Sequence, residues 1–383
     1  MRILFWYPDP SQSGAASSEV KLIEGYCNRF PDDDLTVMCA AGSPLVKLGN
    51  LGNCHVEIAG RYIPREAYLL GMLDLALWRF NRRRSFDVFW STNNGLYIRR
   101  KVPQVLYVKN AYQVYTRETI ALHPGSALRV SLLRRFFRRS LRVSSAVIVE
   151  TPLMGRYLQE ISGCPTQVIV VPKAVVAEGE KSERPMNERI ARRLEGIEGK
   201  AKLLYVATSY PHKNHRVLAG MMNQFRQKDT PVRLVVTISA DEWKQLAGEA
   251  AASLVESGHV IPLGWVDKDE LGLLYRACDV CVMPSLLESL SSAHIEAMYW
   301  KRPQIVADLP YAHDLCGDSA LYASPQDSSA WRSQVERLLA DAPLREELVT
   351  RGVERLSAFP ESWEVMADGI RAVLVAVVVN PGR

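Results

Sequence analysis

Short apolar runs alternate with longer amphipathic stretches along most of the chain. In the first half these runs occupy residues 2–7, 35–40, 87–91, 104–108 and 146–150, and in the second half residues 202–206, 232–238, 259–264, 280–284 and 304–307. Their length and their β-branched and aromatic content indicate buried strands, and helical patterns separate most of them. Strands that alternate with helices predict parallel α/β sheets in both halves.

Each half opens with the same order of elements, an apolar strand followed by a turn-rich loop and a helical pattern. Residues 175–200 between the halves are charged and poor in large apolar side chains, which predicts a linker and a short connecting helix. We therefore expect two Rossmann-like, doubly wound domains, residues 1–175 and 176–360, and a helical segment 361–383 that can pack back on the first domain. Two such sheets facing each other across a cleft would place the carboxyl ends of their strands around one ligand.

Composition supports a globular enzyme. The 383 residues are 48% hydrophobic and 23% charged, and no apolar run approaches the roughly 18 residues needed to span a bilayer. The opening residues indicate a strand and not a signal peptide. Seven scattered cysteines do not describe a disulfide framework. Cys278 and Cys281 form a C-x-x-C without a second ligand pair, so packing is favoured over zinc or redox chemistry.

Charge is distributed unevenly between the two halves. Residues 1–175 hold 23 Lys and Arg against 13 Asp and Glu, a net +10, whereas the remainder holds 24 against 29, a net −5. Residues 128–143 combine an apolar stripe with an arginine stripe at helical spacing, which predicts a basic amphipathic helix. The pattern suits an ordinary surface helix and adsorption on an anionic membrane equally well. Nucleic acid is disfavoured because no nucleic-acid-binding motif accompanies the charge.

The stretch "ESLSSAHIEAM" places Glu288 and Glu296 eight positions apart near the start of a predicted helix. The first-turn amides of a helix lack intrahelical partners and attract anions. A carboxylate accepts hydroxyl hydrogen bonds well, so the two acids can hold two polyols on either side of an anionic group. A nucleotide sugar has this layout. The alternative is a capped surface helix with two solvated acids.

A second loop suitable for phosphate follows the strand at residues 202–206. There, His212 and Lys213 lie between a strand and a helix, where a cation can reach a phosphate at the strand ends. Two such loops in one domain strengthen the prediction of a nucleotide-sugar site.

Three segments, "YPHKNH", "PSLLESLSSAHIEAM" and "PQIVADLPYAHDLCGDSALYASPQD", resemble the donor domain of family 4 GT-B glycosyltransferases, which are retaining enzymes with a nucleotide-sugar donor. The resemblance implies that Glu288 contacts the donor sugar, that Glu296 contacts the ribose and that Lys213 neutralises the departing diphosphate. It also implies donor contacts from a further set of residues: Gly14, Thr208, His212, Ser289, Leu290, Ser291 and Ser292.

The chain departs from the family pattern at three places. Thr208 stands where many members carry an arginine, so that a phosphate cation is missing or comes from His212 or another residue. Ser289-Leu290-Ser291 replaces a common Gly-Phe-Gly. Lys109 and Asn110 follow the strand at residues 104–108, where a histidine is usual, and they are the acceptor-side candidates.

Several other polar residues are interpreted without a catalytic role. Asp32 to Asp34 precede a strand and do not follow one, so a solvated turn is favoured over an Asp-x-Asp metal site. His259 is expected at a strand start, and Tyr112 and Tyr115 either line the cleft or pack. We expect no metal and no cofactor.

The resulting prediction is a GT-B hexosyltransferase of envelope polysaccharide or lipopolysaccharide synthesis. It would use a nucleoside-diphosphate sugar and a glycan or lipid-linked glycan acceptor, and the anomeric configuration of the sugar would be retained. It would be cytoplasmic and could attach to the inner face of the cell membrane. The alternatives are a sugar-nucleotide epimerase of GT-B shape and a nucleotide-sugar-binding protein without turnover. A screen with UDP-, GDP- and dTDP-sugars separates the three.

Overall fold

The chain forms two compact units in its computed structural model. The first unit comprises Met1–Ile120, Gly125–Ala174 and Pro360–Arg383, and the second is built from Val175–Phe359. The structure describes residues 1–7, 14–59, 85–92, 102–115, 127–162, 166–174, 185–248 and 251–380. Among these residues, no helix is both long enough and apolar enough to cross a membrane.

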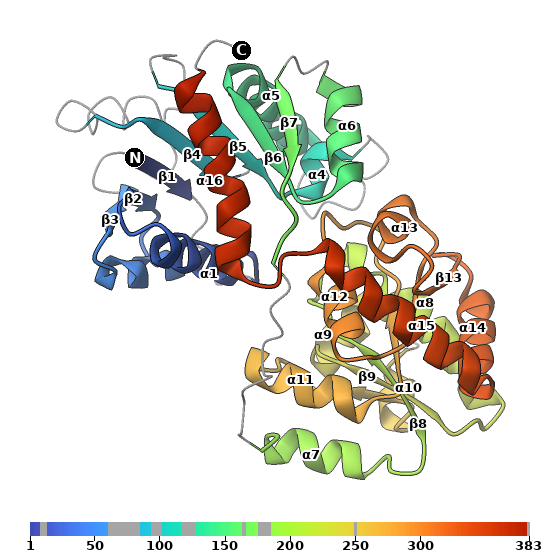
Figure 1. Cartoon of the computed structure of the whole chain (residues 1–383). Coiled ribbons are helices and arrows are strands. Elements are labelled where there is room, and N and C mark those ends of the chain that lie inside the picture. Colours follow the sequence, from blue (N-terminus) through green and yellow to red (C-terminus); the bar gives the residue numbers. More distant parts are fainter. Residues whose placement is uncertain are drawn as a thin grey trace. The chain divides into compact units, whose positions relative to one another are not determined.

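The first unit contains a seven-stranded sheet whose strand pairs are all parallel. The strand order is β3-β2-β1-β4-β5-β6-β7 (Figure 1), so the order reverses between β1 and β4. The strands are β1 (Arg2–Tyr7), β2 (Asp34–Cys39), β3 (Cys54–Ile58), β4 (Val88–Thr92), β5 (Gln104–Val108), β6 (Ala146–Val149) and β7 (Gln167–Val170).

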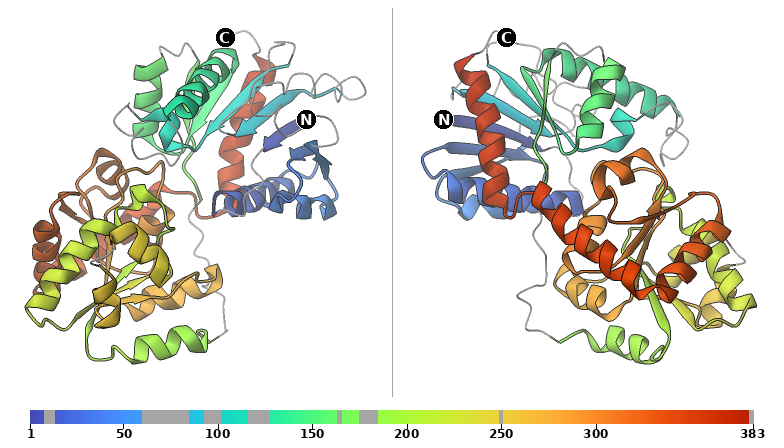
Figure 2. Two further views of the ribbon diagram at one scale, coloured as in Figure 1. Left: turned by 180° about the vertical axis from the view of Figure 1, so that it is seen from behind. Right: turned by 45° about the vertical axis from the view of Figure 1, so that its right-hand side comes forward.

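Helices cover both faces of this sheet. They are α1 (Gly14–Arg29), the 3-10 helix η1 (Pro44–Asn50), α4 (Ala111–Val114), α5 (Ala127–Val143), α6 (Pro152–Ser162) and α16 (Trp363–Val379). Val105 and Tyr107 of β5 pack with α1 and α16, whereas Leu106 and Val108 pack with α5 and α6. The two views in Figure 2 show α16 on the opposite face from α5 and α6. A strand covered on both faces is apolar throughout, which explains the continuous apolar runs in the sequence.

The last helix belongs to the first unit although its residues follow the second unit in sequence. α16 packs along α1, and Arg371 donates from Nε to the Asp33 carboxylate at 2.8 Å. The same carboxylate accepts from the amino terminus at 2.7 Å and from the Tyr26 hydroxyl at 2.9 Å. Burial raises the pKa of Asp33, but these three donors outweigh it and hold the pKa below its usual range. The expectation of a solvated turn is therefore wrong for Asp33, which is a buried anchor.

The second unit contains a six-stranded sheet, again with every strand pair parallel. Its order is β10-β9-β8-β11-β12-β13, which reverses between β8 and β11. The strands are β8 (Ala201–Tyr205), β9 (Val232–Val236), β10 (Val260–Pro262), β11 (Val280–Met283), β12 (Gln304–Ala307) and β13 (Leu321–Ala323). The prediction of two doubly wound α/β domains is confirmed.

The helices of the second unit flank this sheet, with α8 against α14 and α12 against α15. Their bounds are α7 (Glu188–Glu195), η4 (Pro211–Lys213), α8 (His215–Gln227), α9 (Ala240–Ala247), α10 (Ala252–Glu256), α11 (Lys268–Ala277), α12 (Ser292–Tyr299), α13 (Pro310–Cys316), α14 (Ser328–Ala340), α15 (Ala342–Arg355) and η6 (Leu356–Ala358).

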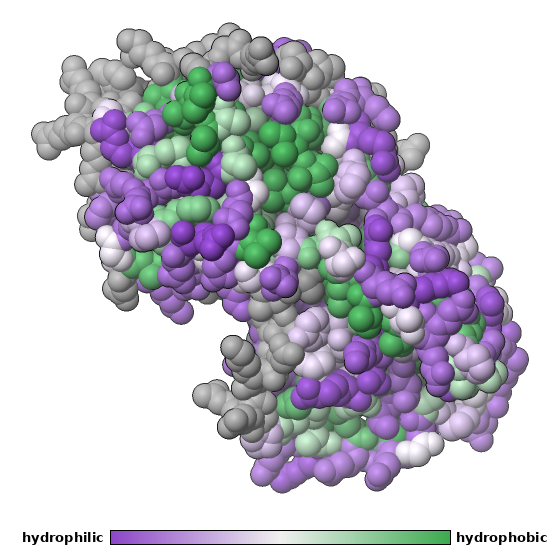
Figure 3. All heavy atoms as spheres, in the orientation of Figure 1, coloured by the Kyte–Doolittle hydropathy of each residue, from purple (hydrophilic) through white to green (hydrophobic). Residues whose placement is uncertain are grey.

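Apolar side chains reach the surface of the first unit beside α16 and β7 (Figure 3). β7 is an edge strand, and its Val170 remains 39% exposed. An edge strand buries less of its surface than a central one, so its sequence carries a weaker apolar signal.

We predict that Gly25→Ala destabilises the protein, although alanine usually favours a helix. A Cβ at Gly25 would lie 2.8 Å from Cβ of Trp363 and 2.9 Å from its carbonyl carbon, so α1 and α16 would have to move apart. The expected loss is about 1–3 kcal/mol of unfolding free energy, the usual cost of overpacking. Denaturant unfolding measures it.

The matched control is Gly49→Ala, because the nearest atoms to a Cβ there are 3.7 Å away. This variant should stay within about 0.5 kcal/mol of the wild type. Equal effects at the two glycines would contradict the close packing of α1 and α16.

Candidate active site

The loops that follow β8 and β11 lie side by side where the strand order of the second sheet reverses. β8 pairs directly with β11 through Leu203 with Val280 and Leu204 with Cys281. In open α/β sheets, ligands bind outside the carboxyl ends of the strands at this switch point. The two loops hold Lys213 and Glu288, the residues predicted to carry the chemistry.

Lys213 and Glu288 form an ion pair with Nζ 2.5 Å from Oε1. The two side chains are only 17% and 11% exposed. Burial raises the pKa of Glu288, but the Lys213 charge and hydrogen bonds from Lys213 and Ser285 outweigh it and hold the pKa below its usual range. The Glu288 carboxylate is thus ionised at neutral pH. Little water screens the pair, so its electrostatic interaction with a neighbouring group is strong.

Asn214 fixes the backbone beside Lys213. Its φ of 55° is left-handed, a conformation that Asn adopts more readily than most residues. Its side-chain amide donates to the carbonyls of Pro284 at 3.1 Å and Pro325 at 2.8 Å. The loop after β8 is thereby tied to the loops after β11 and β13.

Two further hydrogen bonds join the loops after β8 and β11. The Tyr205 hydroxyl donates to the Lys213 carbonyl at 2.7 Å and lies 3.1 Å from Oγ of Ser285. The Leu286 amide donates to the His212 carbonyl at 2.7 Å. Lys213 therefore projects from a backbone that is held on several sides.

The helix predicted after Glu288 is α12, which begins at Ser292. Ser291 occupies the N-cap position, but its side chain makes no capping hydrogen bond to the first turn. The first amides of a helix have no intrahelical acceptor and carry the positive end of its dipole. Ser289, Leu290, Ser291 and Ser292 thus lie at the amino end of this helix, directly after Glu288.

Glu296 lies within α12 and is half-buried. The hydroxyl of the buried Tyr275 donates to its Oε2 at 3.0 Å. Burial, together with the Glu296 charge, raises the pKa of Tyr275 well above its usual range, so the phenol stays protonated and keeps donating. Tyr275 therefore orients the Glu296 carboxylate. The sequence did not predict this contact, because Tyr275 lies in a different helix, α11.

His212 and Thr208 do not supply a second cation at neutral pH. Burial, together with the Lys213 charge, lowers the pKa of His212 to about 4. Its ring stacks on that of Tyr210 with 5.6 Å between centroids. Thr208 is exposed, and its carbonyl accepts from the Tyr210 amide at 2.9 Å. In this environment His212 is therefore uncharged at neutral pH, and Lys213 is the cation of the loop.

Two residues near this edge were missed in the sequence analysis. His294 of α12 is 1% exposed, and its ring nitrogens have no hydrogen-bond partner among the described residues. Burial lowers its pKa to about 4, so it is neutral. Trp265 follows the carboxyl end of β10 and is 68% exposed. The large aromatic side chain in the loop "PLGWVD" is the sequence feature that could have identified Trp265 as a candidate binding residue.

The candidates of the first unit occupy the carboxyl edge of its own sheet. Lys109 follows β5 and is buried, with Nζ 2.8 Å from Glu19 and 3.9 Å from Glu150. The Tyr107 hydroxyl donates to Glu150 at 2.9 Å. The Lys109 ammonium therefore lies close to two buried acids, a structural task that histidine would perform only when protonated.

Asn110 and Gly14 lie at the starts of helices. The Asn110 side chain accepts from the Tyr112 amide at 3.0 Å and caps α4, and Gly14 is the first residue of α1. Tyr115 packs edge to face with Tyr157, with 5.1 Å between ring centroids. These positions adjoin the carboxyl ends of β1 and β5.

The basic helix predicted over residues 128–143 is α5. Its Arg134 guanidinium donates to the carbonyls of Tyr112 at 3.2 Å and Tyr115 at 2.7 Å, so this arginine serves the fold. The other arginines of the stripe are exposed: Arg135, Arg138, Arg139 and Arg142.

No group of three or more His, Cys, Asp or Glu side chains able to hold a metal ion occurs within the described residues. Cys278 and Cys281 are both buried, and burial raises the pKa of Cys278 to about 12. His259 precedes β10 and lies 3.0 Å through Nδ1 from Oγ of Ser257.

Comparisons with known proteins point to one family. Residues 200–341 match the model described as "Glycosyl transferases group 1". The O-antigen chain mannosyltransferase RfbU of Salmonella typhimurium is 29% identical over 135 residues, which are 35% of this chain and 37% of that protein. The O-antigen chain mannosyltransferase B of Escherichia coli is 27% identical over 165 residues, 42% of each chain. The matched segments thus span less than half of these relatives.

Solved structures resemble the chain over nearly its whole length. Sucrose-phosphate synthase from Thermosynechococcus elongatus superposes with a TM-score of 0.73 at 19% identity, covering 99% of both chains. Anabaena HepE, solved in complex with UDP-glucose, gives a TM-score of 0.67 at 15% identity and covers 98% of this chain and 100% of its own. These likenesses establish the fold. The chain therefore has the two-domain GT-B fold of these structures, and its residues 200–341 match the glycosyl transferases group 1 in sequence.

Proposed function

We propose that the chain transfers a hexose-type sugar from a nucleoside-diphosphate sugar to a glycan or lipid-linked glycan acceptor in envelope polysaccharide synthesis, with retention of the anomeric configuration. The observation that carries this proposal is the buried Lys213–Glu288 pair beside the start of α12, at the switch point of the second sheet. The O-antigen mannosyltransferases that match part of the chain support the substrate class.

The donor diphosphate would lie between Lys213 and the first turn of α12. Lys213 supplies a mobile ammonium group, and the helix amides supply fixed partial charges, so charge that develops on the leaving diphosphate is stabilised without rearrangement of the backbone. This stabilisation of the leaving diphosphate matters most when the bond to the sugar breaks and the sugar becomes oxocarbenium-like.

The two glutamates would bind the two ends of the donor. Glu288 is ionised beside Lys213 and can accept from sugar hydroxyls while its negative charge favours the positive charge that grows on the sugar. Glu296, held by Tyr275, would accept from ribose hydroxyls. The exposed indole of Trp265 offers a flat surface on which a nucleotide base can stack.

We predict that Glu288→Gln and Glu296→Gln change different kinetic constants. The ribose is unchanged in the reaction, so loss of the Glu296 carboxylate should raise KM for the donor and spare kcat. The sugar develops charge, so loss of the Glu288 carboxylate should mainly lower kcat. Steady-state kinetics with the donor found in the screen measures both.

Thermal unfolding is the control for these variants, because glutamine is nearly the same size as glutamate. Equal changes in kcat and KM for the two variants would contradict the separate roles. Free epimerised sugar, or donor binding without turnover, would instead identify one of the two alternatives to a transferase.

We also predict that Lys213→Met lowers the rate on the order of 100-fold, the scale of losing one well-placed electrostatic group. Methionine keeps much of the apolar stem and removes the charge. The matched control is Lys228→Met, because Lys228 is 57% exposed. Near-normal transfer by the Lys213 variant would show that another cation holds the diphosphate.

Transfer should continue when divalent cations are chelated. Lys213 and the α12 amides would provide the positive charge that a metal provides elsewhere, and the described residues contain no cluster of ligands for one. A transfer assay in chelator, with and without added magnesium or manganese, measures this. A strict metal requirement would overturn this part of the proposal.

We infer that the enzyme is cytoplasmic and can attach to an anionic membrane through α5. The exposed side chains Arg135, Arg138, Arg139 and Arg142 would each contribute roughly 1 kcal/mol near an anionic surface. Such attachment weakens as salt screens the charges. Lys109 and Asn110 remain acceptor-side candidates at the carboxyl edge of the first sheet.

Vesicle sedimentation tests the attachment. At low salt, the wild type should bind vesicles rich in phosphatidylglycerol, and replacement of the four exposed arginines of α5 by glutamate should abolish binding. Arg134 is kept because it bonds to two carbonyls. The control replaces four exposed basic residues elsewhere: Lys47, Arg216, Lys228 and Arg337. Equal loss in both variants, or no binding by the wild type, would contradict a role for α5.

A further inference from the structure

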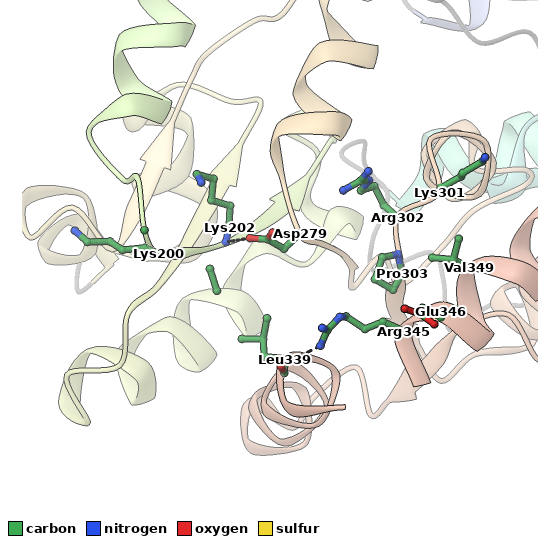
Figure 4. A pocket seen from close by; sticks show the side chains of 12 residues that line it. Lys200, Lys202, Asp279, Lys301, Arg302, Pro303, Leu339, Arg345, Glu346 and Val349 are labelled. Atoms are coloured by element: carbon green, nitrogen blue, oxygen red, sulfur yellow. Dashed lines mark hydrogen bonds between the residues drawn. The ribbon is translucent and has the colours of Figure 1, made fainter. Parts of the chain in front are cut away.

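A cavity of ≈ 590 Å³ opens in the second unit, lined by the residues that precede β8, β11 and β12 (Figure 4). It therefore lies at the amino ends of these strands, the opposite edge of the sheet from Lys213 and Glu288. The ends of α14 and α15 that meet there complete the lining with Leu339 and Arg345. Nothing in the donor chemistry uses this cavity.

The lining of the cavity is strongly basic. Its charged residues are the cations Lys200, Lys202, Lys301, Arg302 and Arg345, and the anions Asp279 and Glu346. Five cations against two anions leave a net +3. This excess is notable in a half of the chain with a net charge of −5.

The two arginines are held in place by the protein. Arg302 donates to the carbonyls of Trp300 and Cys278, both at 3.1 Å, and Arg345 donates to the carbonyl of Leu339 at 3.0 Å. Carbonyl acceptors leave the positive charge of a guanidinium uncompensated. These two groups give the cavity a fixed positive field.

The three lysines are free to move. Among the described residues, no carboxylate pairs with Nζ of Lys200, Lys202 or Lys301. The nearby Asp279 carboxylate accepts a hydrogen bond from the Lys202 backbone amide at 2.7 Å. In Figure 4 the lysine side chains stand around the rim and their ammonium groups extend away from one another. Lysine has a flexible stem and three donors, so each ammonium group can turn toward an anion.

Lys301 has a backbone conformation that is unfavourable for any residue other than glycine, asparagine or aspartate. Its φ of 55° is left-handed, and it directly follows the last turn of α12, where glycine is the usual residue. A cation near a helix carboxyl end is favourable, but an ordinary L-residue costs folding free energy in this conformation. The cost is consistent with a positive charge retained for binding.

We propose that this cavity binds a small, multiply phosphorylated anion at a site separate from the donor site. Several mobile ammonium groups around two fixed guanidinium groups match several phosphate oxygens. The described lining contains no aromatic side chain on which a nucleotide base could stack, and its apolar side chains are Ala201, Pro303, Leu339 and Val349. The recognised chemistry is thus the phosphate groups themselves, either of a soluble diphosphate or of a phospholipid headgroup.

Calorimetric titration with inorganic pyrophosphate tests the proposal. A saturating nucleoside monophosphate, which lacks a diphosphate group, first occupies the nucleotide part of the donor site, and pyrophosphate is then added. The wild type should show binding that Lys200→Glu/Lys301→Glu weakens by about tenfold or more, as expected for loss of charge-assisted contacts. The matched control, Lys47→Glu/Lys228→Glu, changes the net charge equally at exposed sites elsewhere and should bind as the wild type does.

The same titration of Lys213→Met separates this proposal from the proposed function. Binding retained in that variant belongs to the cavity, whether or not the chain uses a nucleotide-sugar donor. Vesicles rich in phosphatidylglycerol form a second arm, used with the variant whose four exposed α5 arginines are replaced by glutamate so that α5 does not contribute. Binding to vesicles alone, lost when the cavity lysines are also replaced, would identify a lipid headgroup as the source. If neither pyrophosphate nor vesicles bind in a way that the cavity variant weakens, the proposal is overturned.

The Lys301→Gly variant separates a binding role of Lys301 from a structural one, because the two roles predict different changes in pyrophosphate affinity. Glycine accepts the left-handed backbone, so the melting temperature should rise by about 2 °C, while pyrophosphate affinity falls about threefold with the lost charge. Unchanged affinity with raised stability would show that Lys301 serves no ligand.

Discussion

The buried ion pair between Lys213 and Glu288 is the interaction on which the candidate site depends. Its partners are distant in sequence and meet because β8 and β11 are neighbours at the point where the strand order reverses. Asn214, in a left-handed conformation, ties the lysine loop to the carbonyls of Pro284 and Pro325. A donor diphosphate would compete with Glu288 for the same ammonium group. Its binding should therefore loosen the pair and leave the carboxylate available to the sugar.

Positive charge is arranged differently at the two edges of the second sheet. At the carboxyl edge, one lysine works with the start of α12, and His212 and His294 remain neutral because burial lowers their pKa values to about 4. At the amino edge, several lysines and arginines surround a cavity without a matching set of acids. In the first unit, by contrast, Lys109 is paired with two buried acids, Glu19 and Glu150. Only the first two arrangements leave positive charge for a ligand.

Much of the fold and of the candidate site could be predicted because their signals are local. Central strands such as β5 and β12 are buried on both faces and form apolar runs in the sequence. The edge strands β3, β7 and β13 are partly exposed and were not predicted, whereas the edge strand β10 is mostly buried and was predicted. The spacing between Glu288, just before α12, and Glu296, within it, is also local. The burial of Asp33 under Arg371 was not predictable, because those residues lie 338 positions apart. The carbonyl contacts of Arg134 and the neutrality of His212 likewise arise only from tertiary packing.

The proposed mechanism requires that Lys213 bind the β-phosphate of the donor nucleotide. A double cycle tests it by comparing the affinities of a nucleoside diphosphate and the matching monophosphate, for the wild type and for Lys213→Met. The account predicts that the wild type prefers the diphosphate by about tenfold or more and that the variant loses most of this preference. An equal preference for the diphosphate in both proteins would contradict it.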